Sequence, residues 1–366
     1  MLSKKILLNI LKFFLFLSIG VVILYLVYRN QNAAFQEDCA LRGVPAQDCS
    51  LIQEVVNAFG SVNYFWILMV FVVYGISNLS RAARWVMLIK TLGYQPKFSN
   101  AFLTTIIGYF ANLGIPRMGE LVRAGTMARY ERIAVEKVIG TVAVDRIVDV
   151  LSIFIVTGLA FLLDYDSITR FIDQYVNVDG KTVGSSNILL ILGISGLIGF
   201  GMLYAFRKNL MRIKFIQKIV NVAKGFGQGL QTIARVERPW LFILHSINVW
   251  LMYYFMCYFC FLAFPPTAGL SPVAALTVYV FGAWGMVVPS PGGMGTYHLL
   301  AQLALSFHGV SGTNSFAWAN ISFFSVQLAC NILGGITALI LLPILNKDYE
   351  PMPTVDLEYE VEGVKR

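Results

Sequence analysis

The chain has 366 residues, of which 57% are hydrophobic and 13% charged. This balance excludes an ordinary soluble domain and is typical of an all-α polytopic membrane protein; the apolar runs are continuous, which argues against a membrane β-barrel. The formal net charge is +8, but the basic residues lie in loops between apolar runs. We therefore attribute the charge to membrane topology and expect no nucleic-acid partner.

The first span is expected at 6–28, after a short basic N-terminus. This run is longer than the apolar region of an ordinary signal peptide, so we expect it to be retained. The polar segment 29–61 follows, with four acidic and two basic residues. We place this segment outside the cell, where Cys39 and Cys49 could form a disulfide, although the sequence alone leaves their pairing open.

A second span is expected at 62–80, and it ends in a basic segment that we place in the cytoplasm. The stretch 98–128 comes next. Its apolar part of about 18 residues is near the lower limit for a spanning helix. Pro116 follows this part and breaks the stretch. Because basic segments flank both sides of this stretch, both ends are expected in the cytoplasm. We predict a re-entrant hairpin, since irregular backbone at membrane depth occurs where it is buried or lines a wet cavity.

The third span, 138–163, carries Asp145, Arg146 and Asp149. The two aspartates are four residues apart and share a helix face, and Arg146 is three residues from Asp149. Charges at this depth are costly and face the protein interior or a cavity. Two interpretations stay open: an internal ion-pair network that locks helices together, or part of a path for a substrate or for protons.

The acidic segment 164–186 is predicted outside, and a fourth span is predicted at 187–206. The segment 207–238 has eight basic residues and one acidic residue. Its mixture of apolar and basic residues indicates an amphipathic helix on the inner leaflet. The fifth span is expected at 240–263.

Two apolar arms, 271–289 and 296–307, flank the motif PSPGGMG. The loops on either side of them contain no Lys or Arg, which predicts a second hairpin that enters from outside. The sixth span is expected at 316–345, and the acidic tail from 347 is expected to be disordered in the cytoplasm.

This scheme gives six transmembrane helices plus two re-entrant hairpins in an inverted repeat, an architecture of many secondary transporters. Only four of the 28 basic residues fall outside, so both termini are placed in the cytoplasm and the protein in the cell membrane. We divide the chain into an N-terminal helix and loop (1–61), a membrane domain (62–346) and a tail (347–366). The alternative is two kinked helix pairs that merely pack together.

Four motifs together resemble the flippase-like membrane domain of lysylphosphatidylglycerol synthetases and of stand-alone proteins that share it. They are RAARW at 81–85, an asparagine and a proline before GELVR at 119–123, VDRIVD at 144–149, and PSPGGMG at 289–295. The resemblance covers roughly 60–345 and implies lipid translocation between leaflets. The family is linked to aminoacylated phospholipids, hopanoids and polyprenyl-linked glycolipids. We expect the cytosolic synthetase activity of the synthetases to be absent here.

Family members often carry a glutamate shortly after the PGG element, whereas this sequence has TYH, ending in His298. His298 could replace that glutamate as a donor, or it could be a histidine at a helix interface. We expect Arg117 and Arg123 to bind a lipid phosphate, because the guanidinium fork donates paired hydrogen bonds. Glu120 would hold an arginine or bind a cationic head group. The predicted substrate-binding set is Asn112, Pro116, Arg117, Gly119, Glu120, Arg123, Pro289, Pro291, Gly292, Gly293, Gly295 and His298.

The sequence therefore predicts a lipid flippase that moves an anionic or lipid-phosphate substrate, with membrane lipids as partners. Whether it forms a homo-oligomer stays open. We expect no enzymatic activity, no cofactor and no metal, because neither HExxH nor a cluster of acids at metal-ligand spacing is found. The alternatives are a non-transporting scaffold for a lipid or cell-envelope enzyme and, less favoured, a membrane lipid transferase.

Overall fold

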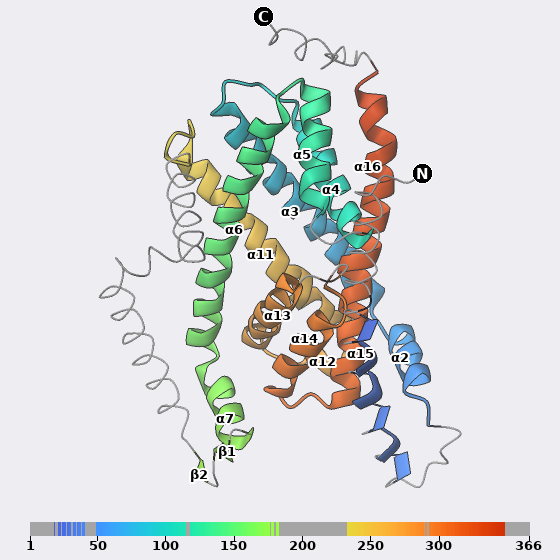
Figure 1. The fold of residues 1–366 in the computed structure, drawn as a ribbon. Coiled ribbons are helices and arrows are strands. Elements are labelled where there is room, and N and C mark those ends of the chain that lie inside the picture. The colour runs from blue at the N-terminus through green and yellow to red at the C-terminus, as the bar shows by residue number, and fades with distance from the viewer. Residues whose placement is uncertain are drawn as a thin grey trace, which may run out of the picture.

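The computed structural model describes residues 49–114, 118–175, 177–178, 181–182, 233–288, 290 and 293–347, with scattered helical positions between 18 and 40. These parts are almost entirely helical (Figure 1). The elements in chain order are α2 (Leu51–Gly60), α3 (Tyr64–Lys90), α4 (Phe98–Gly114), α5 (Met118–Glu131), α6 (Val135–Leu163), α7 (Tyr165–Tyr175), the antiparallel pair β1 (Asn177–Val178) and β2 (Lys181–Thr182), α11 (Pro239–Ala263), α12 (Pro265–Ala268), α13 (Pro272–Val287), α14 (Thr296–Ser306), α15 (Gly312–Ser322), the π-helical segment η2 (Phe323–Cys330) and α16 (Asn331–Leu345).

Within these described parts, four segments are long and apolar enough to cross a membrane. They are α3, α6, α11 and the run Gly312–Leu345, which α15, η2 and α16 form together. Each coincides with one of the predicted spans. The predicted span 187–206 lies outside the described residues, the span 6–28 lies mainly outside them, and so do most of the basic segment 207–238 and the tail.

Helix α3 is longer than the predicted second span. Helix α3 does not stop at residue 80 but continues through Arg81 and Arg84 to Lys90. Both arginines are buried, with 2% and 0% of their surface exposed. Paired arginines usually mark a cytoplasmic end of a span. Here they lie inside the protein, because carboxylates on α6 neutralise them.

Two pairs of antiparallel helices fill the interior of the molecule. In Figure 1 the pair α4–α5 occupies the upper half and the pair α13–α14 the lower half, between α6 on one side and α16 on the other. The connection at 115–117 and residues 289, 291 and 292 lie outside the described residues. The two helix pairs fall in the two stretches of sequence for which hairpins were predicted.

In each pair a glycine allows the two helices to approach closely. A Cβ atom added at Gly119 would overlap the carbonyl oxygen of Gly108, so the backbones of α4 and α5 are in contact. In the other pair, a Cβ atom added at Gly285 would lie 2.8 Å from the carbonyl oxygen of Thr296. Only glycine allows such a close approach of two helices.

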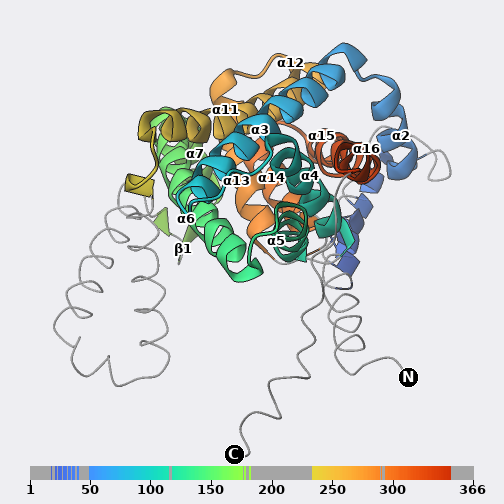
Figure 2. The ribbon, with the colours of Figure 1, turned by 90° about the horizontal axis from the view of Figure 1, so that it is seen from above.

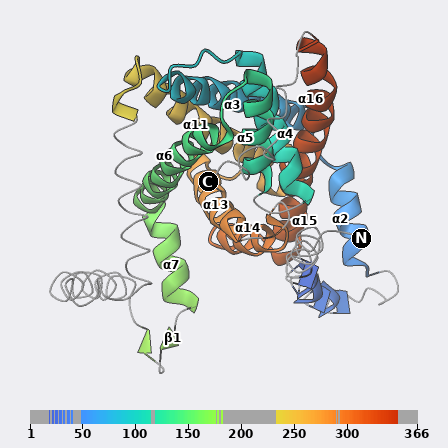
Figure 3. The same ribbon diagram turned by 45° about the horizontal axis from the view of Figure 1, so that its top comes forward.

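The helices pack in two corresponding sets. Helix α4 packs against α3 and α16, and α13 packs against α11 and α6. Likewise α5 packs against α6, and α14 packs against α15. The two sets meet along α3 and α11, which lie side by side and antiparallel: Asn63 before α3 is bonded to Ala263 at the end of α11, and Leu88 near the end of α3 packs with Phe242 near the start of α11. Seen from above, α13 and α14 lie behind α4 and α5, and the tilted view separates the two layers (Figures 2 and 3).

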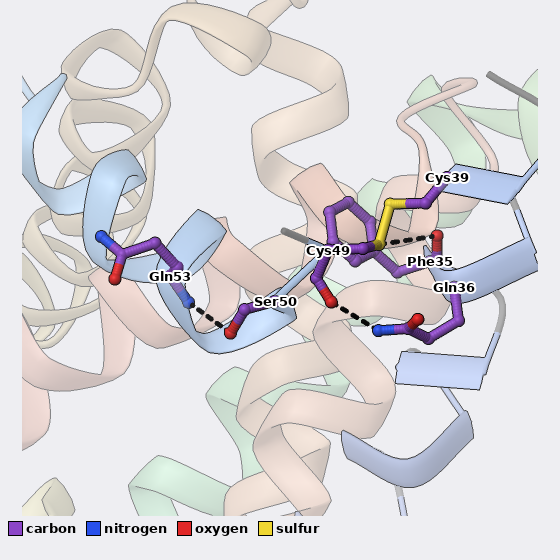
Figure 4. Close-up of a disulfide and its surroundings, with 6 residues drawn as sticks. All are labelled: Phe35, Gln36, Cys39, Cys49, Ser50 and Gln53. Atoms are coloured by element: carbon purple, nitrogen blue, oxygen red, sulfur yellow. Dashed lines mark hydrogen bonds between the residues drawn. A yellow bond between two sulfur atoms is a disulfide. The ribbon is translucent and has the colours of Figure 1, made fainter. Parts of the chain in front are cut away.

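A disulfide between Cys39 and Cys49 ties the N-terminal segment to the start of α2 (Figure 4). The Gln36 side chain donates to the carbonyl oxygen of Cys49, and Ser50 caps α2 by accepting from the backbone N–H of Gln53 at 3.3 Å. Leu51 then packs against Phe316 of α15 in a small apolar cluster. The disulfide therefore fixes the segment that covers α15.

Replacing both Cys39 and Cys49 by serine is expected to cost about 2 kcal/mol of local stability, near the lower end of the usual range, because the closed loop is short. Hydrogen exchange should accelerate in α2 and leave α6 unchanged. The single variant Cys257→Ala, which removes a free buried thiol from α11, is the control. Unchanged exchange of α2 in the double variant would show that packing alone holds this segment.

Candidate functional site

Two carboxylates on α6 hold two buried arginines of α3. Arg81 Nη1 donates to Asp149 Oδ2 at 2.8 Å and to Asp145 Oδ2 at 3.3 Å. Arg84 donates through Nε to Asp145 Oδ1 at 2.8 Å and through Nη2 to Asp149 Oδ1 at 2.7 Å. Each carboxylate is shared by both guanidinium groups, and such charge-assisted bonds are the strong ones. The sharing explains how charged groups are accommodated within two candidate spans.

Helix α5 adds a third arginine to the same carboxylate. Arg123 Nη2 donates to Asp145 Oδ2 at 3.0 Å, and its guanidinium carbon lies 4.0 Å from the ring centre of Trp85. Trp85 is itself fixed, because its indole nitrogen donates to Thr141 Oγ1 at 2.9 Å. The close contact of α4 and α5 sets the position of Arg123 on α5. The network thus joins α3, α5 and α6.

One ion pair of the network is accessible. Arg146 Nε lies 2.5 Å from Glu120 Oε1, and Arg146 Nη1 donates to Asp149 Oδ2 at 3.0 Å. The side chains of Arg146 and Glu120 are 35% and 41% exposed, whereas Asp145 is fully buried. In the described network four guanidinium groups face three carboxylates, which leaves one excess positive charge: Arg81, Arg84, Arg123 and Arg146 against Glu120, Asp145 and Asp149.

A cavity of about 490 Å³ adjoins this network. Both helix pairs border it near their connections: Asn112 and Glu120 come from α4 and α5, and Ser290 and Gly293 from the connection between α13 and α14. Four charged side chains line the cavity, namely Arg81, Glu120, Arg146 and Asp149. Its size is that of a small-molecule or head-group site.

Aromatic side chains form much of the remaining wall. Tyr109 and Tyr253 lie with their hydroxyl oxygens 3.1 Å apart, and Arg81 Nη2 donates to the Tyr253 hydroxyl at 3.2 Å. Further around, the hydroxyl of Tyr74 donates to Asn331 Oδ1 at 2.8 Å and links α3 to α16. The segment η2 contributes to the wall here, and π-helical turns are frequent at functional sites.

The structure separates the predicted substrate-binding residues into three groups. Asn112, Glu120 and Gly293 line the cavity. A second group lies elsewhere in the fold. Arg123 donates to Asp145, and Gly119 sits in the contact of α4 with α5, where its backbone N–H donates to Asn112 Oδ1 at 2.8 Å. Gly295, with a positive φ of 84°, precedes α14. The third group lies outside the described residues: Pro116, Arg117, Pro289, Pro291 and Gly292.

His298 belongs to the second group. It is buried on α14, with its ring centre 4.8 Å from that of Phe323, and it is not among the residues that line the cavity. This placement favours the helix-interface interpretation. The residues of the predicted charge network, Asp145, Arg146 and Asp149, do lie together, and the structure adds Arg81, Arg84, Glu120 and Arg123 to them.

Several cavity residues were missed by reasoning from the sequence. Tyr74, Asn78 and Arg81 are spaced four and three residues apart, so they form a polar stripe along one face of the apolar helix α3. Gln327 and Asn331 form a similar stripe across η2 and α16. This periodicity of polar residues could have identified both stripes from the sequence. The contact between them could not be predicted locally, because Tyr74 and Asn331 are 257 residues apart in the chain.

A family model described as the lysylphosphatidylglycerol synthase TM region matches residues 50–334. The chain belongs to this family. The matched residues include the whole network and every residue that lines the cavity. No solved structure matches the chain.

Two curated proteins are similar to this family member. A UPF0104 membrane protein of Methanocaldococcus jannaschii is 22% identical over 315 residues, which cover 81% of this chain and 90% of that protein. The glycosyltransferase AglD of Haloferax volcanii is 22% identical over 320 residues, or 80% of this chain. That match covers 51% of the glycosyltransferase, so this chain corresponds to about half of it.

Proposed function

We propose that the protein is a lipid translocase that moves an anionic head group, a lipid phosphate, between the two leaflets. The observation that carries the proposal is the accessible Arg146–Glu120 pair at a head-group-sized cavity between two broken helix pairs. The family is named for a lipid synthase, and one relative is named a glycosyltransferase. Both names agree with a role in handling membrane lipids or glycans.

In this proposal Arg146 takes the place expected for Arg123. Arg123 is already engaged by Asp145 and Trp85, whereas Arg146 faces the cavity with a partner that can be exchanged. A phosphate would displace the Glu120 carboxylate and accept hydrogen bonds from the guanidinium group. The excess positive charge of the network favours an anion over a cationic head group. The chemistry is binding and release, without a covalent step.

The proposal includes the topology of the membrane domain. The pairs α4–α5 and α13–α14 would be re-entrant hairpins that enter from opposite faces, with six spans in all and both termini in the cytoplasm. The corresponding packing of the two helix sets supports an inverted repeat, in which two halves exchange conformations around a fixed site. The lipid chains would remain in the bilayer while the head group occupies the cavity.

A leaflet-resolved transport assay in proteoliposomes tests the proposal, with anionic phospholipid, aminoacylated phospholipid and polyprenyl phosphate compared. Arg146→Ala should reduce translocation of the anionic lipid by about tenfold or more, because a charged hydrogen-bonding group is lost. Glu120→Gln should lower the lipid concentration needed for half-maximal rate, since Arg146 is then free of its competitor.

Lys137→Ala is the matched control, because it removes an exposed cation from the same helix α6, away from the cavity. Translocation equal in the Arg146→Ala variant and the unaltered protein would overturn the phosphate role. Failure of the folded protein to move any of the three lipids would instead favour the scaffold function.

A further inference from the structure

The lining of the cavity beside the ion-pair network changes in chemistry from one part to another. Its four charged residues, Arg81, Glu120, Arg146 and Asp149, come from α3, α5 and α6. The other polar side chains of the lining, among the described residues, carry hydroxyl, amide and indole groups without charge, and they come mainly from α3, α11, α13, η2 and α16. A head group with its phosphate on Arg146 would therefore place its remaining atoms against neutral polar groups.

Four of these neutral side chains have a buried polar atom without a hydrogen-bond partner in the described part of the chain. The atoms are Asn78 Oδ1, Trp250 Nε1, the Tyr279 hydroxyl oxygen and Ser290 Oγ. Asn78 and Ser290 have only 2% and 6% of their surface exposed. Buried polar groups in proteins are nearly always hydrogen-bonded, so four unpartnered atoms around one cavity indicate which groups a ligand would contact.

Other polar groups of the same wall are already paired with one another. The hydroxyl oxygens of Tyr297 and Ser322 lie 2.7 Å apart, and the Tyr74 hydroxyl donates to Asn331 Oδ1. The amide of Asn78 donates through Nδ2 to the carbonyl oxygen of Tyr74 at 2.9 Å, which leaves only its oxygen unpartnered. The wall is thus satisfied internally except at the four atoms named above.

The four unpartnered atoms together require a ligand that both donates and accepts hydrogen bonds. The indole N–H of Trp250 can only donate, the amide oxygen of Asn78 can only accept, and the hydroxyl groups of Tyr279 and Ser290 can do either. A hydroxyl group on the ligand can pair with each of them. An ammonium group only donates and would leave the indole N–H unpartnered, while a hydrocarbon chain would leave all four unpartnered.

Aromatic rings complete this part of the wall. The ring of Trp250 lies 6.2 Å from that of Tyr253 and 6.2 Å from that of Tyr279, in edge-to-face arrangements. Arg81 Nη2 donates to the Tyr253 hydroxyl, so the aromatic cluster adjoins the charged network. Ring faces provide apolar surface beside polar tips, which suits a ligand whose C–H groups lie between hydroxyl groups.

We propose that the cavity binds a phosphate that carries a hydroxyl-rich group, a polyol or a sugar. The phosphate would contact Arg146, and hydroxyl groups of the ligand would pair with Asn78, Trp250, Tyr279 and Ser290. This inference rests on the proposed function and narrows its substrate from lipid phosphates in general to this chemical class.

Equilibrium binding of lipids to the full-length protein in detergent micelles tests the inference without reference to transport. In each of two matched pairs, both lipids have a singly charged phosphodiester and only one has a hydroxyl-rich group. The pairs are phosphatidylinositol with phosphatidylmethanol, and polyprenyl phosphoglucose with polyprenyl methyl phosphate. The hydroxyl-rich member of at least one pair should bind about tenfold more tightly, because several hydrogen bonds are gained. The pair that shows this preference distinguishes a phospholipid from a polyprenyl source.

The variant Tyr279→Phe removes one unpartnered hydroxyl group and keeps the ring. It should reduce the preference severalfold and leave the unfolding midpoint unchanged or higher, because the lost group has no partner in the protein. Tyr297→Phe is the matched control, since it removes the hydroxyl group of another cavity tyrosine that is paired with Ser322. That control should lower the unfolding midpoint and keep the preference.

Equal binding within both pairs, or a preference undiminished in Tyr279→Phe, would overturn this inference and leave the phosphate role of Arg146 in place. Tighter binding of phosphatidylethanolamine than of either hydroxyl-rich lipid would overturn it as well. If the folded protein bound none of these lipids, the proposed function would fail together with the inference, so the two failures are distinguishable.

Discussion

Replacing Asp145 by asparagine is expected to lower the free energy of unfolding by about 3–5 kcal/mol, the usual cost of removing one member of a buried ion pair. The carboxylate of Asp145 is fully buried and accepts from Arg81, Arg84 and Arg123. Asparagine has nearly the same shape but no charge, so three guanidinium groups would lose their shared partner. Denaturation by SDS in mixed micelles measures the change.

Glu120→Gln is the matched control for this prediction. Glu120 also pairs with an arginine of the network, but it is 41% exposed. Exposed pairs contribute about 1 kcal/mol or less, so a small change is expected. If both variants lost the same small amount, the interior of the network would have to be hydrated, and the burial of Asp145 would be contradicted.

Replacing Gly119 by alanine should cost about 3 kcal/mol or more, at the upper end of the range for overpacking. The new Cβ atom would overlap the carbonyl oxygen of Gly108 and lie 2.7 Å from the side chain of Asn112. The obstacle is backbone, which cannot rotate away as a side chain can. Helix α5 would have to move, and Arg123 with it. The unfolding midpoint should fall and, under the proposed function, the transport rate should fall with it.

The same helix provides a control of opposite sign. A Cβ atom at Gly125 would meet nothing within 4 Å. Gly125→Ala should therefore stabilise the protein by about 0.5–1 kcal/mol, since alanine has the better helix propensity. Destabilisation by both substitutions would mean that α5 is sensitive to side-chain volume along its whole length, contrary to the contact at Gly119.

The long apolar runs allowed the four candidate spans among the described residues to be predicted, because a membrane requires helices of that length and composition. The breaks at Pro116 and at the glycine-rich motif near Gly293 likewise placed the two helix pairs. The end of α3 could not be predicted. Local charge at Arg81 and Arg84 favours a loop, and only carboxylates more than 60 residues away reverse that preference.

The site was less predictable than the fold for the same reason. The network of α6 was visible because charges within an apolar run are conspicuous, and the spacing of Asp145 and Asp149 puts them on one face. Whether an arginine faces a cavity or a buried carboxylate depends on tertiary packing. The position of Arg123 on the predicted hairpin and its guanidinium chemistry favoured it as a binding residue, whereas the structure engages Arg123 with Asp145 and places Arg146 at the cavity.

The unequal numbers of guanidinium and carboxylate groups have an electrical consequence. A unit charge that crosses the full membrane potential changes in energy by about 2.3 kcal/mol for each 100 mV. Under the proposed function, and in a cell with a negative interior, the conformation of the empty protein in which this excess positive charge experiences the more negative potential would be favoured. A bound anion with one negative charge would cancel that excess, so the exchange of conformations in the loaded protein would not depend on voltage. The membrane potential would then set the conformation in which the empty protein binds its next lipid.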